Sequence, residues 1–65
     1  MNEKVLKNIR LIRLSKEISQ EYIAEELRIS QSHYSKMEKG ERNINLMQLE
    51  IIAKVLKVKT KDFYK

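Results

Sequence analysis

A chain of 65 residues has room for one small core, and we expect a single domain that spans residues 1–65. The chain contains no cysteine, which excludes disulfide bonds and thiolate metal sites, and its one glycine and one histidine leave neither a phosphate-binding loop nor a recognisable catalytic set. The net charge of +5 suits a polyanion such as nucleic acid, and a basic surface that is simply solvated is the alternative.

Two amphipathic helices are predicted in the first half of the chain. The first covers residues 2–15, and its apolar face consists of Val5, Leu6, Ile9 and Ile12. The second covers residues 20–27, with Ser19 as a good N-cap and a buried side that consists of Ile23, Ala24 and Leu27.

Three further helices are predicted after the second one. Ser30 can cap a helix over residues 31–39, which Gly40 can end in the left-handed conformation. Asn45 can cap a helix over residues 46–56, whose core stripe consists of Leu46, Leu49, Ile52, Ala53 and Leu56. Thr60 can cap a short last turn, anchored by Val58 and Phe63. The sequence therefore predicts an all-α protein of five helices without a strand.

The third helix offers few apolar side chains to a core, with Tyr34 and Met37 as its main anchors. Its outer side carries groups that can donate to or accept from base edges in a DNA major groove: Gln31, Ser32, Ser35 and Lys36. Two short helices joined by three residues, with such groups exposed on the second helix, are typical of a helix-turn-helix.

The region from about Ile9 to Phe63 resembles a known family. The matching elements are Ile9, Ile12 and Arg13, then Ile18-Ser19-Gln20, Ile23-Ala24 and Leu27, then Ile29-Ser30-Gln31-Ser32 and Met37-Glu38-Lys39-Gly40, and finally Ile52-Ala53 with Leu56. In this spacing the chain is similar to the Cro/C1-type helix-turn-helix domains of phage repressors and of many bacterial and plasmid regulators. The resemblance implies a compact lambda-repressor-like bundle that binds double-stranded DNA and regulates transcription, without a cofactor.

The resemblance also implies roles for individual residues. The positions that match the base-reading residues of the family are Gln31, Ser32 and Lys36. The positions expected at the DNA backbone are Ser19, Gln20, His33, Ser35, Lys39, Arg42 and Asn43. For His33 a solvated side chain is the open alternative, and no metal is expected because the chain has no cysteine and no second histidine.

Two further features concern the structure rather than DNA contact. Arg13 and Glu38 match an internal ion pair of the family, between the first helix and the end of the third. Family members usually carry glycine after the first, second and fourth helices, where this chain has Glu17, Arg28 and Lys57. We expect these three positions to be either strained or differently shaped.

The fourth helix carries a second apolar stripe, which consists of Met47, Ile51 and Val55. With Val58, Phe63 and Tyr64 nearby, this stripe predicts an interface, and the simplest partner is a second copy of the chain. A two-fold dimer would present two third helices one DNA turn apart, which implies an inverted-repeat operator. For Leu11 and Leu14, ordinary exposure and an interface both stay open.

Other function classes are less well supported. An enzyme is not expected, because the chain lacks a catalytic set and is too short to enclose a deep pocket. The alternative function is a helix-turn-helix protein-interaction module, of antitoxin or coactivator type, that uses the stripe on the fourth helix. No apolar run approaches the roughly 18 residues of a membrane span, and the amino terminus does not resemble a signal peptide, so we expect a cytoplasmic bacterial or phage protein without a membrane partner, at the nucleoid when bound to DNA.

Overall fold

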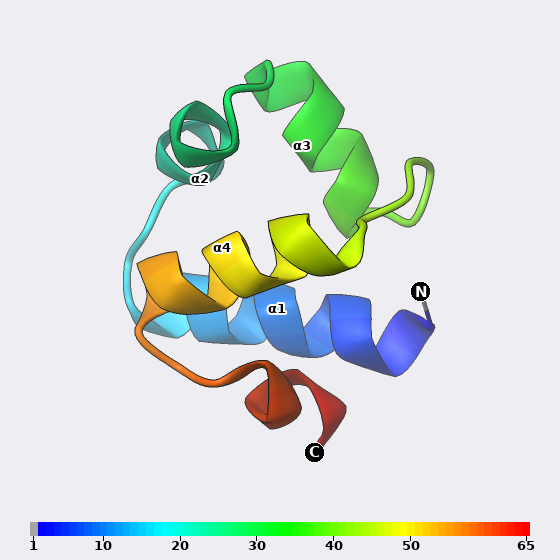
Figure 1. Ribbon diagram of the computed structural model, residues 1–65, viewed down its shortest axis with the longest axis vertical. Coiled ribbons are helices and arrows are strands. Elements are labelled where there is room, and N and C mark those ends of the chain that lie inside the picture. The colour runs from blue at the N-terminus through cyan, green and yellow to red at the C-terminus, as the bar shows by residue number, and fades with distance from the viewer. Residues whose placement is uncertain (1) are drawn as a thin grey trace.

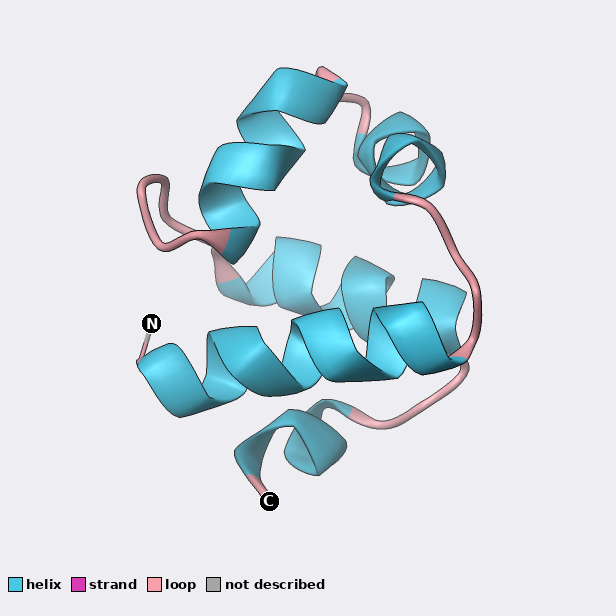
Figure 2. Cartoon of the chain, turned by 180° about the vertical axis from the view of Figure 1, so that it is seen from behind, coloured by secondary structure: helices cyan, strands magenta, loops and turns pink. Residues whose placement is uncertain are grey.

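The computed structural model describes residues 2–65, which form four α-helices and a terminal 3₁₀ helix, η1 (Figure 1). The elements are α1 (Glu3–Ser15), α2 (Gln20–Leu27), α3 (Gln31–Glu38), α4 (Leu46–Leu56) and η1 (Thr60–Tyr64). α2 packs against α3 and α4, while η1 packs against α1 at the other end of the molecule (Figures 1 and 2). Residues 2–65 contain no strand, which confirms the all-α prediction for this part of the chain.

A polar side chain caps the amino terminus of each α-helix. Asn2, Ser19, Ser30 and Asn45 each accept a hydrogen bond from the backbone N–H three residues later, at 2.8 to 3.0 Å. At α4 the exchange is reciprocal, because the Asn45 backbone N–H donates to Gln48 Oε1 at 2.9 Å. These caps fix where α2, α3 and α4 begin, at the residues that the sequence predicts.

A residue in the left-handed conformation follows each α-helix. Glu17, Arg28 and Lys57 have φ values of 55°, 60° and 58°, and Gly40 has a φ of 85°. After each of them, the next backbone N–H donates to the carbonyl five residues earlier, at 2.8 to 3.1 Å. The three non-glycine residues therefore keep the geometry for which glycine is suited, and they carry the strain of a Cβ atom there.

One hydrophobic core joins all five elements. Its buried side chains are Val5, Leu6, Ile9, Ile23, Ala24, Tyr34, Met37, Ile44, Leu49, Ile52, Ala53, Leu56 and Phe63. Gly40 lies close to this core, since a Cβ atom on it would lie 3.3 Å from Leu6 Cδ1. The core holds α2 and α3 in a fixed relation to each other, and this relation positions the outer face of α3.

The structure corrects five details of the predicted fold. The fifth helix is a 3₁₀ helix, and Thr60 does not cap it; the Lys59 backbone N–H instead donates to Asp62 Oδ2 at 2.9 Å. α1 and α3 are each one residue shorter than predicted, because Asn2 and Lys39 are their caps. Leu46 is 76% exposed, since Ile44 is buried at this end of the core instead.

Within residues 2–65, no helix has the length and apolar character of a membrane span.

Candidate nucleic-acid interface

The outer face of α3 is formed by the polar residues that the sequence places there. Gln31, Ser32 and Lys36 are exposed, and Ser35 is half-buried between them. The opposite side of the helix is buried through Tyr34, Met37 and Glu38. Because buried and exposed residues alternate at helical spacing, α3 is fixed to the core along one side and presents hydrogen-bonding groups along the other.

α2 supports α3 through a close crossing. Ala24 is buried where α2 contacts its neighbours, and a small side chain lets the two helices approach each other. Only Arg28, Ile29 and Ser30 separate the two helices, and the Ile29 backbone N–H donates to the Ala24 carbonyl at 3.0 Å. The two helices therefore have the short connection and the packing of a helix-turn-helix.

A buried carboxylate joins α1, α2 and α3. Glu38 Oε2 accepts from Arg13 Nε at 2.7 Å and from the Tyr34 hydroxyl at 2.6 Å. Glu38 Oε1 accepts from Arg13 Nη2 at 3.3 Å and from Gln20 Nε2 at 3.2 Å. Arg13 Nη1 also donates to the Ile18 carbonyl at 2.9 Å, which ties the turn before α2 to the same cluster. The expected Arg13–Glu38 ion pair is thus present in the structure, between residues that are 7% and 8% exposed.

The ionisation of this cluster follows from its hydrogen bonds. Burial alone would raise the pKa of the Glu38 carboxyl, but hydrogen bonds from Arg13, Tyr34 and Gln20, with the charge of Arg13, outweigh it and hold the pKa below its usual value. Burial and the hydrogen bond to Glu38 raise the pKa of the Tyr34 hydroxyl far above its usual range. At neutral pH, Glu38 is therefore ionised and the Tyr34 hydroxyl keeps its proton.

Two members of this cluster were not predicted to belong to it. Tyr34 was expected only as an apolar anchor, although its spacing of four residues from Glu38 on a helix could have indicated the contact. Gln20 was expected at the DNA backbone, and in the structure one of its two amide N–H groups donates to Glu38. Its second N–H stays available, so the expectation of a phosphate contact stays a prediction.

The remaining residues expected at the DNA backbone lie at the start of α2, in the first turn of α3 and in the segment after α3. Ser19 is exposed and caps α2 through its hydroxyl. His33 is half-buried in the first turn of α3. Lys39, Arg42 and Asn43 are exposed in the segment that follows α3. None of these contacts is tested by the structure, and their assignment stays a prediction.

The apolar stripe of α4 is exposed only in part. Met47 is 72% exposed, Tyr64 is exposed, and Ile51, Val55 and Val58 are half-buried. Phe63 does not belong to this surface, because its side chain is completely buried in the core under η1. Leu11 and Leu14 are about half exposed on α1, at 51% and 50%.

Residues 2–65 contain no cluster of three or more His, Asp or Glu side chains that could hold a metal ion.

Comparison with known proteins agrees with the helix-turn-helix formed by α2 and α3. Residues 9–63 match the family model described as helix-turn-helix. The chain is also 44% identical over 55 residues to the control protein C.BamHI of Bacillus amyloliquefaciens, and the alignment covers 83% of this chain and 68% of that protein.

Proposed function

Because the chain belongs to the Cro/C1-type helix-turn-helix family of DNA-binding transcription regulators, we propose that it is a repressor that binds an inverted repeat as a homodimer, with α3 in the major groove. The observation that carries this proposal is the division of α3 into a buried side and a polar side. Tyr34, Met37 and Glu38 attach the helix, so its polar side chains are free for a partner.

Gln31, Ser32 and Lys36 would read the bases. The amide of Gln31, in the first turn of α3, can bond both N6 and N7 of an adenine, and the ammonium group of Lys36 suits O6 and N7 of a guanine. Ser32 can donate or accept at either base. Gln20, Ser35 and the exposed groups after α3 would hold the sugar-phosphate backbone and fix the position of α3, without specifying sequence.

The α4 stripe of Met47, Ile51 and Val55 would form the dimer interface, with Val58 and Tyr64 at its edge. Glu50 and Lys54 line the same shallow hollow as Met47 and Ile51. If two copies of α4 packed antiparallel around a two-fold axis, Glu50 of each copy would face Lys54 of the other. This pattern of charge is self-complementary, which favours a second copy over an unrelated partner.

A dimer of this kind would repress transcription by occupying its operator. The similarity to a protein named as a control protein supports a regulatory role for this chain. The proposal is tested by selecting bound sequences from a random pool of duplex DNA with the wild-type protein and with Gln31→Ala. We expect a palindromic consensus for the wild type and relaxed preference at one base pair of each half-site for the variant.

A second candidate is a protein-interaction module of antitoxin or coactivator type, and the exposure of Met47 is the observation that favours it. The two functions differ in their response to salt. A DNA-binding protein loses affinity steeply as salt increases, whereas an adaptor that works through the α4 stripe would select no DNA sequence and show no such loss.

A further inference from the structure

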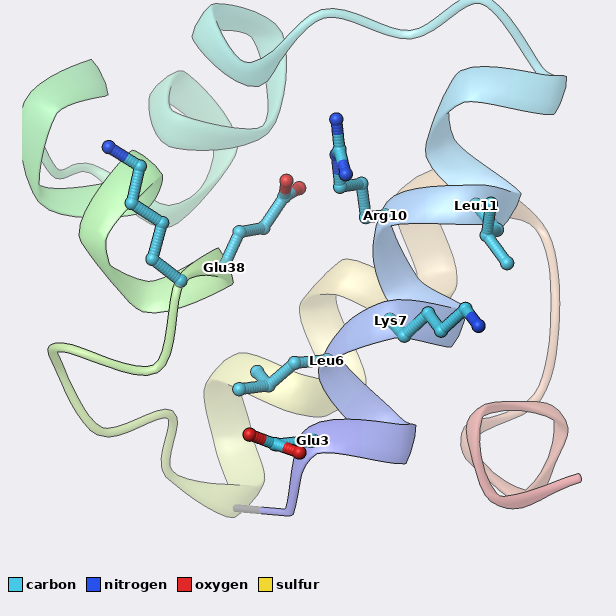
Figure 3. Close-up of a pocket in the computed structure, with 7 residues that line it drawn as sticks. Glu3, Leu6, Lys7, Arg10, Leu11 and Glu38 are labelled. Carbon is cyan, nitrogen blue, oxygen red and sulfur yellow. The ribbon is translucent and has the colours of Figure 1, made fainter.

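Two adjoining cavities lie between α1 and α3, and the larger one also reaches α2. The larger, of about 420 Å³, is lined by Arg10, Gln20, Ser35, Glu38 and Lys39. The smaller, of about 270 Å³, also has Arg10, Glu38 and Lys39 in its lining. Arg10 from α1 and Glu38 from α3 extend into the space between their helices, as Figure 3 shows for the smaller cavity. We call the larger cavity the α1–α3 notch.

The hydrogen bonds and the charge of the Glu38 carboxylate are satisfied without Arg10. A carboxylate has about four acceptor positions, and Glu38 already accepts two hydrogen bonds from Arg13, one from Tyr34 and one from Gln20. The charge of Arg13 balances that of Glu38. Within residues 2–65, neither Arg10 nor Lys39 forms an ion pair.

The notch therefore has an excess of positive charge and several free donors. Arg10 and Lys39 each contribute a cation that no carboxylate of the notch neutralises. The hydroxyl of Ser35 and the second amide N–H of Gln20 lie at the same cavity and can donate to an anion there. A planar guanidinium beside neutral donors suits a phosphate group, to which arginine can donate two parallel hydrogen bonds.

The position of the notch indicates the source of that phosphate. Ser35 and Gln20 lie beside the outer face of α3, which is the face expected in the major groove. A duplex bound there would carry one of its strands past the amino terminus of α2 and the middle of α1. We propose that the α1–α3 notch binds a phosphodiester group of the DNA backbone, with Arg10 as the residue that anchors it. This inference rests on the proposed DNA binding and adds α1 to the contact surface.

The test compares Arg10→Gln with Lys61→Gln, which removes the same charge from η1 at the opposite end of the molecule (Figure 1). Affinity for a labelled duplex that carries the selected sequence is measured by fluorescence anisotropy between about 50 and 200 mM salt. Because the duplex binds two protomers, Arg10→Gln should remove one phosphate contact in each half-site and reduce the slope of log affinity against log salt by about 1.8. The wild type should then lose about 12-fold more affinity than Arg10→Gln across this range, and Lys61→Gln should keep the wild-type slope.

A second measurement identifies the phosphate itself. A neutral methylphosphonate is placed at each backbone position of the duplex in turn. At one position in each half-site we expect the wild type to lose affinity and Arg10→Gln to lose much less, because only the other donors of the notch still contact that phosphate. Arg10→Lys keeps the charge and should restore most of the slope, while thermal melts of all variants should match that of the wild type because Arg10 is exposed.

Three outcomes would overturn the inference. A wild-type slope for Arg10→Gln, or an equal reduction for Lys61→Gln, would show that Arg10 contacts no DNA phosphate, although DNA binding itself would stand. Inorganic phosphate that shifts the Arg10 Nε–H resonance, combined with an unchanged DNA slope for Arg10→Gln, would show a site for free anions instead. Failure of the wild type to bind any duplex would instead contradict the proposed function.

Discussion

Arg13 on α1 and Glu38 at the end of α3 are 25 residues apart in sequence, and they are joined by two hydrogen bonds, of 2.7 and 3.3 Å. The same carboxylate also accepts hydrogen bonds from Tyr34 and Gln20, so one side chain connects α1 with both helices of the helix-turn-helix. Within residues 2–65 no buried side-chain nitrogen or oxygen lacks a hydrogen-bond partner, so this polar cluster is fully satisfied. A satisfied cluster makes the geometry of the helices specific, and its loss leaves a buried charge without a partner.

The first prediction is that Glu38→Ala destabilises the domain by about 3–5 kcal/mol, because Arg13 would stay buried without its carboxylate. For a domain of this size, such a loss would leave much of the protein unfolded at 25 °C. Urea denaturation followed by circular dichroism measures it. Glu41→Ala is the matched control, because Glu41 is exposed, and its effect should stay within about 0.5 kcal/mol. Equal stability of Glu38→Ala and Glu41→Ala would contradict the structural role of the pair.

The second prediction concerns acid. The pKa of Glu38 lies below its ordinary value of 4.5 in the folded state, so the folded protein holds its charged form more strongly than the unfolded chain does. This contribution to the free energy of unfolding is fully present above the unfolded pKa and is lost as the pH falls through the folded pKa. We therefore expect wild-type stability to decrease from about pH 5 downward.

The matched variants for this acid test are Glu38→Gln and Asp62→Asn. The hydrogen bond from the Lys59 backbone N–H lowers the pKa of the half-buried Asp62 carboxyl as well, so Asp62 also contributes to the acid dependence. Urea denaturation at several pH values should show a flatter dependence for Glu38→Gln than for Asp62→Asn, because only Glu38 is buried among its partners. A steeper wild-type-like dependence in Glu38→Gln would assign the acid loss to other carboxylates.

How far the sequence predicts this molecule depends on the range of the interaction that decides each feature. The starts of α2, α3 and α4 follow from Ser19, Ser30 and Asn45, because capping is decided within three residues. The exposure of Leu46 could not be predicted in the same way. Helical spacing shows which face of α4 the residue lies on, but it does not show how far along the helix the neighbouring elements extend.

In the candidate site, too, features decided by local spacing could be predicted, whereas features decided by helix packing could not. The outer face of α3 could be predicted from the spacing of its polar residues, and so could the Arg13–Glu38 pair from the family resemblance. The hydrogen bond from Gln20 to Glu38 joins side chains 18 residues apart, and it depends on the crossing of two helices that periodicity does not specify. Phe63 was assigned both to the core and to a dimer surface, because its apolar character does not say which way the last turn folds.

The third prediction is that glycine stabilises the protein at positions where this chain departs from its family. Arg28 and Lys57 have left-handed backbones at φ 60° and 58°, where a Cβ atom costs about 1–2 kcal/mol and glycine avoids most of that cost. The greater flexibility of unfolded glycine offsets part of the gain, so Arg28→Gly and Lys57→Gly should each add up to about 1 kcal/mol.

Thermal melts of these variants should be compared with those of Arg28→Ala and Lys57→Ala. Alanine removes the same long side chain but keeps the Cβ atom, so it should bring no gain from the left-handed backbone. If both glycine variants melt below the wild type, the strain of the left-handed backbone is smaller than the cost of the greater flexibility of glycine in the unfolded chain.

The last prediction tests the dimer. Met47 is 72% exposed, so Met47→Glu should leave the fold of each protomer intact. In a two-fold interface the new carboxylate would appear twice and lie near the apolar stripe of the partner, where desolvation would penalise it. We expect dimerisation measured by analytical ultracentrifugation to weaken at least about tenfold, equivalent to about 1.4 kcal/mol. Binding to an inverted repeat should weaken more than binding to a single half-site, because only the former depends on the dimer.

Leu11→Glu is the control that distinguishes the two apolar surfaces. Leu11 is 51% exposed on α1, away from α4, and it matches Met47 in being a large apolar side chain on a helix. If α4 forms the interface, Leu11→Glu should dimerise as the wild type does. A loss of dimer with Leu11→Glu but not with Met47→Glu would move the interface to α1 and change the expected spacing of the half-sites. A wild type that stays monomeric at high micromolar concentration, even with operator DNA present, would rule out the homodimer, because two half-sites held one DNA turn apart should promote the contact between protomers.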